Sequence, residues 1–349
     1  MRHYLATLIT INICMVFVFF IALIIWEPEF KRLSARFHHP TMLDISTTIT
    51  PNVIRESVTL HDTAFTYQLN MSTFQAEFPF LQNYKCSLKL SPRKVPEEVV
   101  SMKLLILAIK SHPSSGSRRD ALRRTWANER EINGYKTWPL FLLANTQVVG
   151  HMELVKYENQ MFGDILQWDF NEEHHNLSLK EHCFLEWLNN WLPGVAFVFK
   201  GDDDIYVNPH GLVQYIEEHG CSPRTLHGAL QRHSVAMRYG KYKVSVDLFP
   251  NPKYPYFLSG GGFLIPGQAV GPLYAASRRL PVFPLDDVYL GFMAAAANLT
   301  FRNEDEFHVF GLKYEVCVFK RALVVHGIGP EELIRIWTEV KSATCTGKR

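Results

Sequence analysis

Apolar residues recur in two different patterns in the part of the chain that begins at Lys103. Short continuous apolar runs alternate there with longer segments in which apolar residues return every three or four positions. A continuous run is typical of a buried strand, and the wider spacing predicts a helix that buries one face. The predicted strands are 104–109, 138–143, 164–168 and 195–199, and the predicted helices are 117–126, 149–160 and 178–192. This alternation indicates an α/β fold with a mostly parallel sheet and helices on both faces.

Several residues mark where predicted helices begin or end. Ser117 and Asp120 have the spacing of a capping box, and Pro193 ends the helix before the fourth strand. Farther along, Asp286 is the natural cap of a helix, which leaves Asp287 in the first turn. The remaining predicted elements are helices over 210–219, 288–298 and 331–341 and a strand-like run at 321–325.

The N-terminal part is organised differently. Leu5 to Trp26 is an uncharged run of 22 residues, long enough to cross a bilayer core of about 30 Å as a helix. It predicts a transmembrane anchor over 5–26 behind a cytosolic tail at 1–4. A cleaved signal peptide is the alternative, but no small-residue cleavage site follows the run. Residues 27–70 have no sustained period and are predicted as a stalk, which leaves a globular domain over 71–349.

The sequence contains conflicting indications of the side of the membrane on which this domain lies. Basic residues that flank the span favour the cytosol. N-glycosylation acceptors at Asn70, Asn176 and Asn298 favour the lumen, and so do five cysteines beyond the span that lack metal-binding spacing. We expect a lumenal domain that is N-glycosylated at some of these sites. A bridge between Cys317 and Cys345 would pin the last helix to the core. The pairing of the other three cysteines stays open: Cys86, Cys183 and Cys221.

Three consecutive aspartates follow the fourth predicted strand. Side chains two positions apart on an extended chain share a face, so Asp202 and Asp204 point to one side and Asp203 to the other. Two carboxylates on one side form a cation site that suits Mg²⁺ or Mn²⁺, with positions left for water or substrate phosphates. A solvated acidic turn or a structural Ca²⁺ loop is the alternative interpretation.

More polar groups are expected at the same edge of the sheet, because ligands bind beyond the carboxyl ends of parallel strands. Lys110 and a helix start with Arg118 follow the first strand, and a helix N-terminus that carries arginines suits a diphosphate. Taken alone, the arginines of this helix more often form a solvated face. Dinucleotide and Walker motifs are absent, and a formal charge of +2 does not indicate nucleic acid as a partner.

Three later motifs are ambiguous by themselves. The run Gly260-Gly-Gly262 either lets the backbone pass close to a ligand or forms only a bulge between strands. Asp286 and Asp287 are common residues at a helix start because of the helix dipole alone. His326 follows a strand-like run, where a lone histidine is more often a packing residue than a metal ligand.

Taken together, the motifs carry more information. In order and rough spacing they resemble those of the animal β-1,3-glycosyltransferase family: Arg118-Arg-Asp-Ala-Leu-Arg-Arg-Thr-Trp126, Lys200-Gly-Asp-Asp-Asp204, Tyr254-Pro-Tyr256 before the triple glycine, Asp286-Asp-Val288 and Val325-His326. The resemblance covers about residues 100–345. It is closest to the β-1,3-N-acetylglucosaminyltransferase branch, through Ala108-Ile-Lys-Ser111 and the glycines. It implies a Golgi single-pass type II enzyme with a GT-A-like nucleotide-sugar-binding fold.

The resemblance also implies roles for individual residues. Asp204 would be the direct ligand of Mn²⁺ or Mg²⁺, with Asp202 in the same acidic motif and His326 as a second metal ligand. Asp287 would be the catalytic base, and Asp286 would support it. The residues expected to take part in donor binding are Asp202, Asp203, Lys110, Arg118, Trp126 and Gly261. Of these, Lys110, Arg118 and Trp126 would lie near the uridine pocket or hold its helix.

The function implied is an inverting transfer of N-acetylglucosamine from UDP-GlcNAc to the 3-hydroxyl of a terminal β-galactose on glycoprotein or glycolipid glycans. A β-1,3-galactosyltransferase that uses UDP-galactose is the alternative, and an inactive lumenal glycan-binding relative is the second. A metal-dependent phosphohydrolase lacks a nucleophile motif here. Residues 257–259 and 294–303 depart from the family's usual acceptor-side sequence, so the acceptor stays open, as does a possible homodimer.

Overall fold

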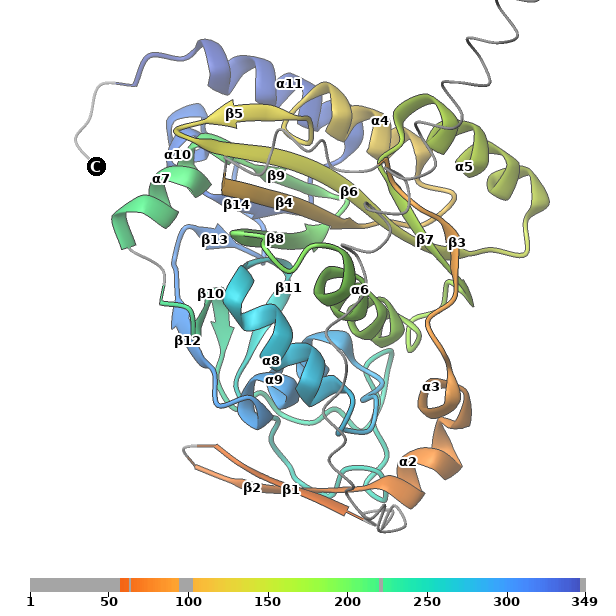
Figure 1. The fold of residues 1–349 in the computed structure, drawn as a ribbon. Coiled ribbons are helices and arrows are strands. Elements are labelled where there is room, and N and C mark those ends of the chain that lie inside the picture. The colour runs from red at the N-terminus through yellow and green to blue at the C-terminus, as the bar shows by residue number, and fades with distance from the viewer. Residues whose placement is uncertain (1–56, 63, 94–102, 220–221, 346–349) are drawn as a thin grey trace, which may run out of the picture. The chain divides into compact units, whose positions relative to one another are not determined.

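The computed structural model describes residues 57–62, 64–93, 103–219 and 222–345 (Figure 1). The predicted tail, the predicted anchor over 5–26 and the first part of the predicted stalk lie outside these residues. Within the described ranges, no helix has both the length and the apolar character needed to cross a membrane.

A nine-stranded mixed sheet forms the centre of the domain (Figure 1). Its strand order is β12-β10-β11-β8-β4-β6-β7-β3, and β5 pairs with β6 outside this path. The strands are β3 (Leu88–Leu90), β4 (Lys103–Lys110), β5 (Arg130–Ile132), β6 (Tyr135–Asn145), β7 (Ile165–Asn171), β8 (Phe197–Asp202), β10 (Thr225–Gln231), β11 (Phe257–Pro266) and β12 (Thr300–Asn303).

The prediction of a mostly parallel sheet is correct only for part of it. Strands β7, β6, β4 and β8 run parallel, as their β-α connections require. In contrast, β11 runs antiparallel to both β8 and β10, and β3 antiparallel to β7. The sheet is therefore mixed, because β11 follows β10 without an intervening helix and runs back between β10 and β8.

Helices cover both faces of this sheet, as the sequence predicts. Alternate residues of β4 point to opposite sides, so Leu104, Ile106 and Ala108 join one core and Leu105, Leu107 and Ile109 join the other. The first core includes helices α6 (Leu177–Trp191), α8 (Gly267–Ser277) and α9 (Asp286–Ala296). The second core includes helices α4 (Gly116–Arg124), α5 (Val149–Phe162) and α11 (Pro330–Ser342).

A three-stranded sheet extends the second core, in the order β13-β14-β9. Its strands are β13 (Phe307–His308), β14 (Val324–His326) and β9 (Ile205–Val207), and helices α7 (Pro209–His219) and α10 (Val316–Arg321) flank it. The strand predicted at 321–325 is thus shorter and later, because residues 316–321 form a helix. Strand β14 pairs antiparallel with β9, with His326 opposite Ile205. This pairing brings a C-terminal histidine beside the residue that follows the aspartates.

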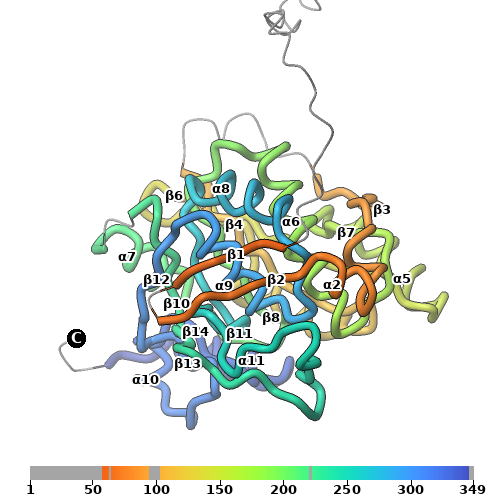
Figure 2. The backbone as a smooth tube through the Cα atoms, turned by 90° about the horizontal axis from the view of Figure 1, so that it is seen from below, coloured from red at the N-terminus to blue at the C-terminus, as the bar shows by residue number. Residues whose placement is uncertain are grey.

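Residues 57–61 and 66–70, which we expected in the stalk, form a hairpin of β1 (Ser57–His61) and β2 (Thr66–Asn70). Figure 2 shows the hairpin running across α9. Tyr67 is fully buried there, and its ring meets that of Phe292 edge to face at 5.7 Å. Helices α2 (Met71–Glu77) and α3 (Pro79–Asn83) follow. The hairpin therefore packs on the same core as the domain.

Two disulfides and the glycosylation acceptors bear on the predicted lumenal setting. The predicted Cys317–Cys345 bridge is present, and Cys86 pairs with Cys183, which the sequence left open. Cys221 lies outside the described residues. Asn176 is buried and its amide donates to the Asn171 carbonyl at 3.0 Å, so a glycan there would disrupt the fold. The two exposed acceptors are Asn70 and Asn298.

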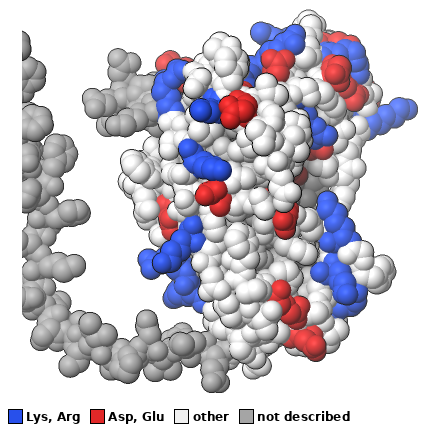
Figure 3. Space-filling model, turned by 90° about the vertical axis from the view of Figure 1, so that its right-hand side faces the viewer, with Lys and Arg blue, Asp and Glu red and all other residues white. Residues whose placement is uncertain are grey.

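Charged side chains are mixed on the surface. On the face that Figure 3 shows, lysines and arginines are interspersed with aspartates and glutamates. This agrees with the near balance of 36 basic and 34 acidic residues in the whole chain.

Candidate active site

The aspartates that end β8 gather with a histidine from the far end of the sequence. One donor atom each from Asp202, Asp204 and His326 lies within 4.8 Å of the others. The Nε2 atom of His326 is 3.3 Å from an Asp204 oxygen and 3.7 Å from an Asp202 oxygen. Asp202 and Asp204 therefore point to the same side, as predicted, and His326 lies beside them. We call these three residues the trio. Backbone bonds from Gly327 and Ile328 to the Asp204 carbonyl hold the two segments together.

This trio fits a divalent cation by its donor set. Two carboxylate oxygens and one imidazole nitrogen on one side of a cleft suit Mn²⁺ or Mg²⁺ with open positions for a ligand. The neighbouring Asp202 carboxylate raises the pKa of His326 against the effect of its burial. Burial alone would raise the pKa of Asp202, but Lys110 and His326 hold it far below its usual value. The carboxylate of Asp202 is thus ionised and available as a ligand.

Asp203 turns away from the trio, as the alternation predicts. It accepts a hydrogen bond from the Ser111 hydroxyl at 2.7 Å and one from Arg118 Nη1 at 2.9 Å. The same Arg118 nitrogen is 3.4 Å from an Asp204 oxygen. Arg118 is the predicted anion-binding arginine at the start of α4, and 39% of its side chain is exposed to the cleft. It therefore orients two of the three aspartates and still faces solvent.

Lys110, at the end of β4, connects the trio to a second pair of carboxylates. Its ammonium lies 3.1 Å from Asp202 Oδ1 and 2.9 Å from Asp286 Oδ2, and only 9% of its side chain is exposed. Burial alone would lower the pKa of Lys110, but the carboxylates of Asp202, Asp286 and Asp287 outweigh that effect and raise it. One buried cation thus holds two acidic motifs that lie more than eighty residues apart in the sequence.

The second acidic motif lies at the start of α9. Both Asp286 and Asp287 are in its first turn, so the predicted cap role of Asp286 is wrong: Leu285 occupies the cap position. Asp287 Oδ2 accepts a hydrogen bond from the Gly260 amide at 2.8 Å. Burial, and then the neighbouring Asp286, raise the pKa of Asp287 to about 7. Lys110 has the opposite effect on Asp286 and keeps its pKa low despite burial. The two adjacent carboxylates therefore have different pKa values, low for Asp286 and raised for Asp287.

The triple glycine makes room for functional side chains. A Cβ atom on Gly260 would lie 2.3 Å from Asp287 Oδ1, and one on Gly261 would lie 3.3 Å from His326. Both glycines lie in strand β11, beside β8. Neither alternative from the sequence describes this fully, because the close approach is to the domain's own site residues. The predicted donor contact of Gly261 remains a hypothesis.

A cleft of about 530 Å³ opens over the trio. It is lined by Lys110, Ser111, His112, Ser114, Ser115, Arg118, Glu172, Leu177, Lys180, Asp202, Asp203, Asp204 and His326. The loop after β4 forms one wall and the aspartates form the other, as the carboxyl-end rule predicts. Phosphate oxygens entering here would meet Arg118 and the trio together.

Trp126 does not line this cleft. Its ring is fully buried, and its Nε1 donates to the Ile205 carbonyl at 2.9 Å. Direct contact with a donor is therefore excluded for this conformation. The tryptophan instead holds the backbone that follows Asp204 through this hydrogen bond.

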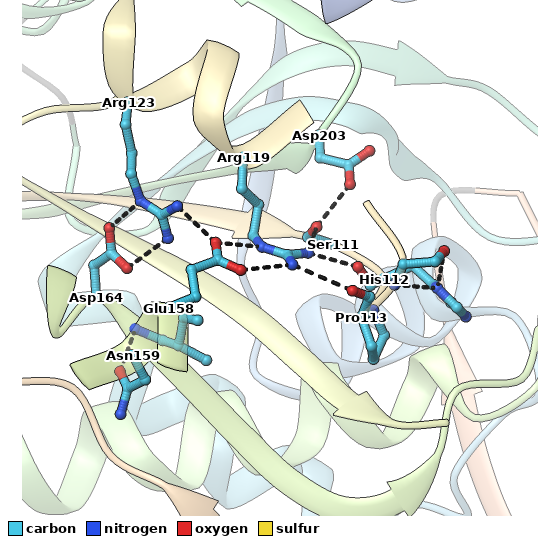
Figure 4. A network of polar contacts seen from close by, with 11 residues as sticks. Ser111, His112, Pro113, Arg119, Arg123, Glu158, Asn159, Asp164 and Asp203 are labelled. Atoms are coloured by element: carbon cyan, nitrogen blue, oxygen red, sulfur yellow. Dashed lines mark hydrogen bonds and ion pairs between the residues drawn. The ribbon is translucent and has the colours of Figure 1, made fainter. Parts of the chain in front are cut away.

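The arginines of α4 are not a solvated face, and this interpretation of the sequence is wrong for most of them. Arg119 is 1% exposed and makes two bonds of 2.8 Å to Glu158 (Figure 4). It also donates to the Ser111 hydroxyl at 3.0 Å and to the His112 carbonyl at 2.6 Å. Arg123 pairs with Glu158 and Asp164. Only Arg124 is largely exposed, at 60%. The helix also lacks the predicted capping box, since it begins at Gly116 and its cap residue makes no side-chain bond.

Two buried ion pairs, one of which lines the cleft, could not be assigned from the sequence. Lys180 lies 2.6 Å from Glu172 and donates to the Ser111 carbonyl at 2.8 Å. Lys200, just before the aspartates, pairs with Glu181. The spacing contained a signal for Lys180, because it lies four residues before the buried Phe184 and thus on the apolar face of its helix. A lysine at such a position needs a partner, and Glu172 provides it.

Comparisons with known proteins identify the family. The family model described as galactosyltransferase matches residues 117–305. The rat "UDP-GlcNAc:betaGal beta-1,3-N-acetylglucosaminyltransferase 7" is 33% identical, covering 78% of this chain and 70% of the relative. The human "Beta-1,3-galactosyltransferase 5" is 30% identical, covering 68% of this chain and 79% of the relative. The structure of mouse xyloside xylosyltransferase 1 matches with a TM-score of 0.34 at 11% identity, over 64% of this chain and 97% of that one. That score is too low to support an inference.

These matches agree with the residues on which the resemblance rests. The matched region contains the α4 arginines, the aspartate triplet, the triple glycine and the acidic pair at the start of α9. The enzyme class predicted from the sequence, a UDP-sugar-dependent β-1,3-glycosyltransferase, is confirmed. The chain belongs to the galactosyltransferase family.

Proposed function

We propose that this enzyme transfers N-acetylglucosamine from UDP-GlcNAc to the 3-hydroxyl of a terminal β-galactose, with inversion and with a divalent metal ion. The observation that carries the proposal is the Lys110 ammonium, which lies 3.1 Å from Asp202 and 2.9 Å from Asp286. It joins a cation site and a candidate base around one reaction centre. The choice of N-acetylglucosamine is supported by relatives whose names specify β-1,3-N-acetylglucosaminyltransferases.

The trio and Arg118 form the leaving-group end of the proposed site. Asp202, Asp204 and His326 would hold Mn²⁺ or Mg²⁺, which when bound would neutralise charge on the departing diphosphate. Arg118 is anchored by Asp203 and exposed to the cleft, so its guanidinium can approach phosphate oxygens directly. Lys110 adds a fixed positive charge behind them. These groups are already oriented by hydrogen bonds, which favours stabilisation of developing charge.

Asp287 forms the proposed base end. Its carboxylate is held by the Gly260 amide, and its pKa of about 7 matches the proton affinity that a general base needs near neutral pH. It would accept the proton of the acceptor's 3-hydroxyl as the oxygen attacks the anomeric carbon. Asp286 stays ionised through Lys110 and supports the pair by its charge. One base and one displacement convert an α-linked donor into a β-linked product without a covalent intermediate.

We also propose the cellular setting on the basis of the sequence. Residues 5–26 would anchor the chain in the Golgi membrane, with the described domain in the lumen. The two disulfides are compatible with an oxidising compartment. Asn70 and Asn298 are the accessible glycosylation acceptors. A homodimer remains part of this hypothesis.

UDP-galactose as the donor is the second candidate. The specific observation in its favour is the 30% identity to a human β-1,3-galactosyltransferase over 68% of this chain. The acidic pair and the trio would serve either donor in the same way. The third candidate is an inactive relative that only binds glycans. It is disfavoured because the trio, Lys110 and the candidate base Asp287 are all present.

The test is a transfer assay with the full chain, Mn²⁺ and either UDP-GlcNAc or UDP-galactose, against acceptors that end in β-galactose or in β-N-acetylglucosamine. We expect one β-1,3-linked product, identified by nuclear magnetic resonance, from UDP-GlcNAc and the galactose-terminated acceptor. Chelation of the metal should stop its formation. Transfer from UDP-galactose alone would replace the first candidate with the second, and an α-linked product would refute the inverting mechanism.

A further inference from the structure

A second cleft, of about 580 Å³, lies between α4, α7, α10 and α11 and has a basic lining. We call it the basic cleft. Its basic lining residues come from five separate segments: Arg124, Arg130, His210, Lys320 and Lys341. None of the described residues that line it is an aspartate or a glutamate. This differs from the catalytic cleft, where cations and carboxylates are paired.

Arg130 is the central charge of the basic cleft. Its Nε donates to the Asn128 side chain at 2.7 Å and its Nη2 to the Thr125 carbonyl at 2.8 Å. The guanidinium also lies 5.4 Å from the centre of the Trp337 ring. Both hydrogen-bond partners are neutral, and burial lowers the pKa of Arg130. A partly buried arginine is normally paired with a carboxylate, and within the described residues this one makes no ion pair.

The other basic side chains of the cleft do not compensate the positive charge of Arg130. Burial, and then Arg130 and Lys341, lower the pKa of His210, so these groups act on one another across the cleft. Lys320 donates to the Ala343 carbonyl, again a neutral acceptor. Arg124 is 3.4 Å from Asp120, but both side chains are about 60% exposed, so this pair provides little compensation. Elsewhere the charges are mixed, as Figure 3 shows for one face.

The size and the lining of the cleft indicate the class of ligand. A volume of about 580 Å³ exceeds what a lone ion needs and lies in the range of sites for small organic molecules. The ring of Trp337 is partly exposed on the lining, and such a ring can cover the apolar face of a sugar. Arginine provides the planar fork that matches phosphate and sulfate oxygens. We propose that the basic cleft binds a sugar-sized ligand that carries a phosphate or sulfate ester.

This site is separate from the catalytic cleft. The two clefts share no lining residue. They lie at opposite ends of β9, because Asp204 precedes the strand and Asn208 follows it. Binding at one can therefore be removed without removing a residue of the other.

The experiment titrates the full chain by calorimetry, without divalent metal, with glucose 6-phosphate, glucose 6-sulfate and glucose. We expect at least one of the charged sugars to bind, and glucose to bind at least about tenfold more weakly because it lacks the ester. The variants Arg130→Gln and Lys341→Gln should each weaken the charged sugar by about tenfold. Lys341 is exposed, so its variant is informative even if Arg130→Gln fails to fold.

Two matched controls separate this site from other causes. Arg335→Gln removes an exposed positive charge on the same helix α11 but outside the cleft, and should leave binding unchanged. Asp204→Asn alters the catalytic cleft and should not weaken binding at the basic cleft. The proposal is overturned if neither charged sugar binds, if glucose binds equally well, or if Lys341→Gln and Arg335→Gln give the same affinity.

Discussion

The two ends of the proposed catalytic site use the same type of side chain in opposite environments. At the leaving-group end, the side chains of Asp202, Asp204 and His326 are 34%, 25% and 34% exposed. At the base end, Asp286 is 14% exposed, and burial raises the pKa of Asp287 to about 7. In the proposed mechanism, carboxylates would serve as charged ligands where water and cations reach them, and as a proton acceptor where they are packed and adjacent to one another.

Lys110 makes this difference possible because it contacts both ends. It holds Asp202 and Asp286 ionised, and Asp287, which lies opposite Gly260, is the carboxylate left with a raised pKa. Substitutions at the two ends should therefore have different effects. At the base end we expect kcat to fall, and at the leaving-group end we expect donor affinity to fall.

The largest effect is expected at the base end. Asp287→Asn keeps the shape and the Gly260 hydrogen bond but removes the proton acceptor, so kcat should fall by about a thousandfold or more. UDP affinity in the presence of Mn²⁺ should stay within about twofold, since the metal site is intact. Steady-state kinetics and calorimetry measure the two quantities. Asp120→Asn, an exposed carboxylate on α4, is the matched control. Near-normal turnover in Asp287→Asn would remove this residue from the base role.

At the leaving-group end we expect the opposite signature. Asp204→Asn or His326→Ala removes one donor atom of the trio, so Mn²⁺-dependent UDP binding should weaken by about tenfold to a hundredfold. The comparison is calorimetry with and without Mn²⁺, because the metal-free affinity should change little. His308→Ala, in the adjacent strand β13, is the control histidine. Equal losses with and without metal would show that these residues do not act through a cation.

Part of this arrangement could be predicted from the sequence. Continuous apolar runs located the strands, and two-residue alternation placed Asp202 and Asp204 together with Asp203 on the other side. The pairing of Arg119 with Glu158, and of Arg123 with Glu158 and Asp164, could not be predicted, because those carboxylates come from α5 and the segment after it. The raised pKa of Asp287 likewise depends on burial, which only the packed fold defines. The antiparallel course of β11 left no local signal either.

The next prediction concerns the contact between β11 and the base. In Gly260→Ala the new Cβ would lie 2.3 Å from Asp287 Oδ1 and 3.0 Å from Lys110 Nζ, so the carboxylate must move. We expect kcat to fall by about tenfold to a hundredfold, because small displacements of a base slow catalysis steeply. Gly271→Ala in α8, where the new Cβ would lie 3.6 Å from Asn189 Oδ1, should retain normal kinetics. Unchanged kcat in Gly260→Ala would show that the base position tolerates this shift.

The pH profile should report the base end directly. With a pKa of about 7, Asp287 is mostly protonated in acid, so kcat/KM should rise about tenfold per pH unit up to that value and then level off. The charge of Asp286 raises the pKa of its neighbour, so in Asp286→Asn the midpoint should move to lower pH. Kinetics across the pH range measure both midpoints. A midpoint that moves upward in this variant would contradict the proposed coupling.

The smallest effect is on stability. A carboxyl group whose pKa rises from about 3.9 in the unfolded chain to about 7 in the fold favours the protonated native state. Between these values, rising pH ionises the unfolded chain first, so stability is lost as pH increases and the loss is complete above the folded pKa. Asp287→Asn removes this penalty, and thermal unfolding should therefore shift upward by roughly a few degrees at about pH 8. At about pH 4 the aspartate is protonated in the fold, and the two proteins should unfold at similar temperatures. An equal shift at both pH values would mean that the variant acts through packing rather than through the ionised base.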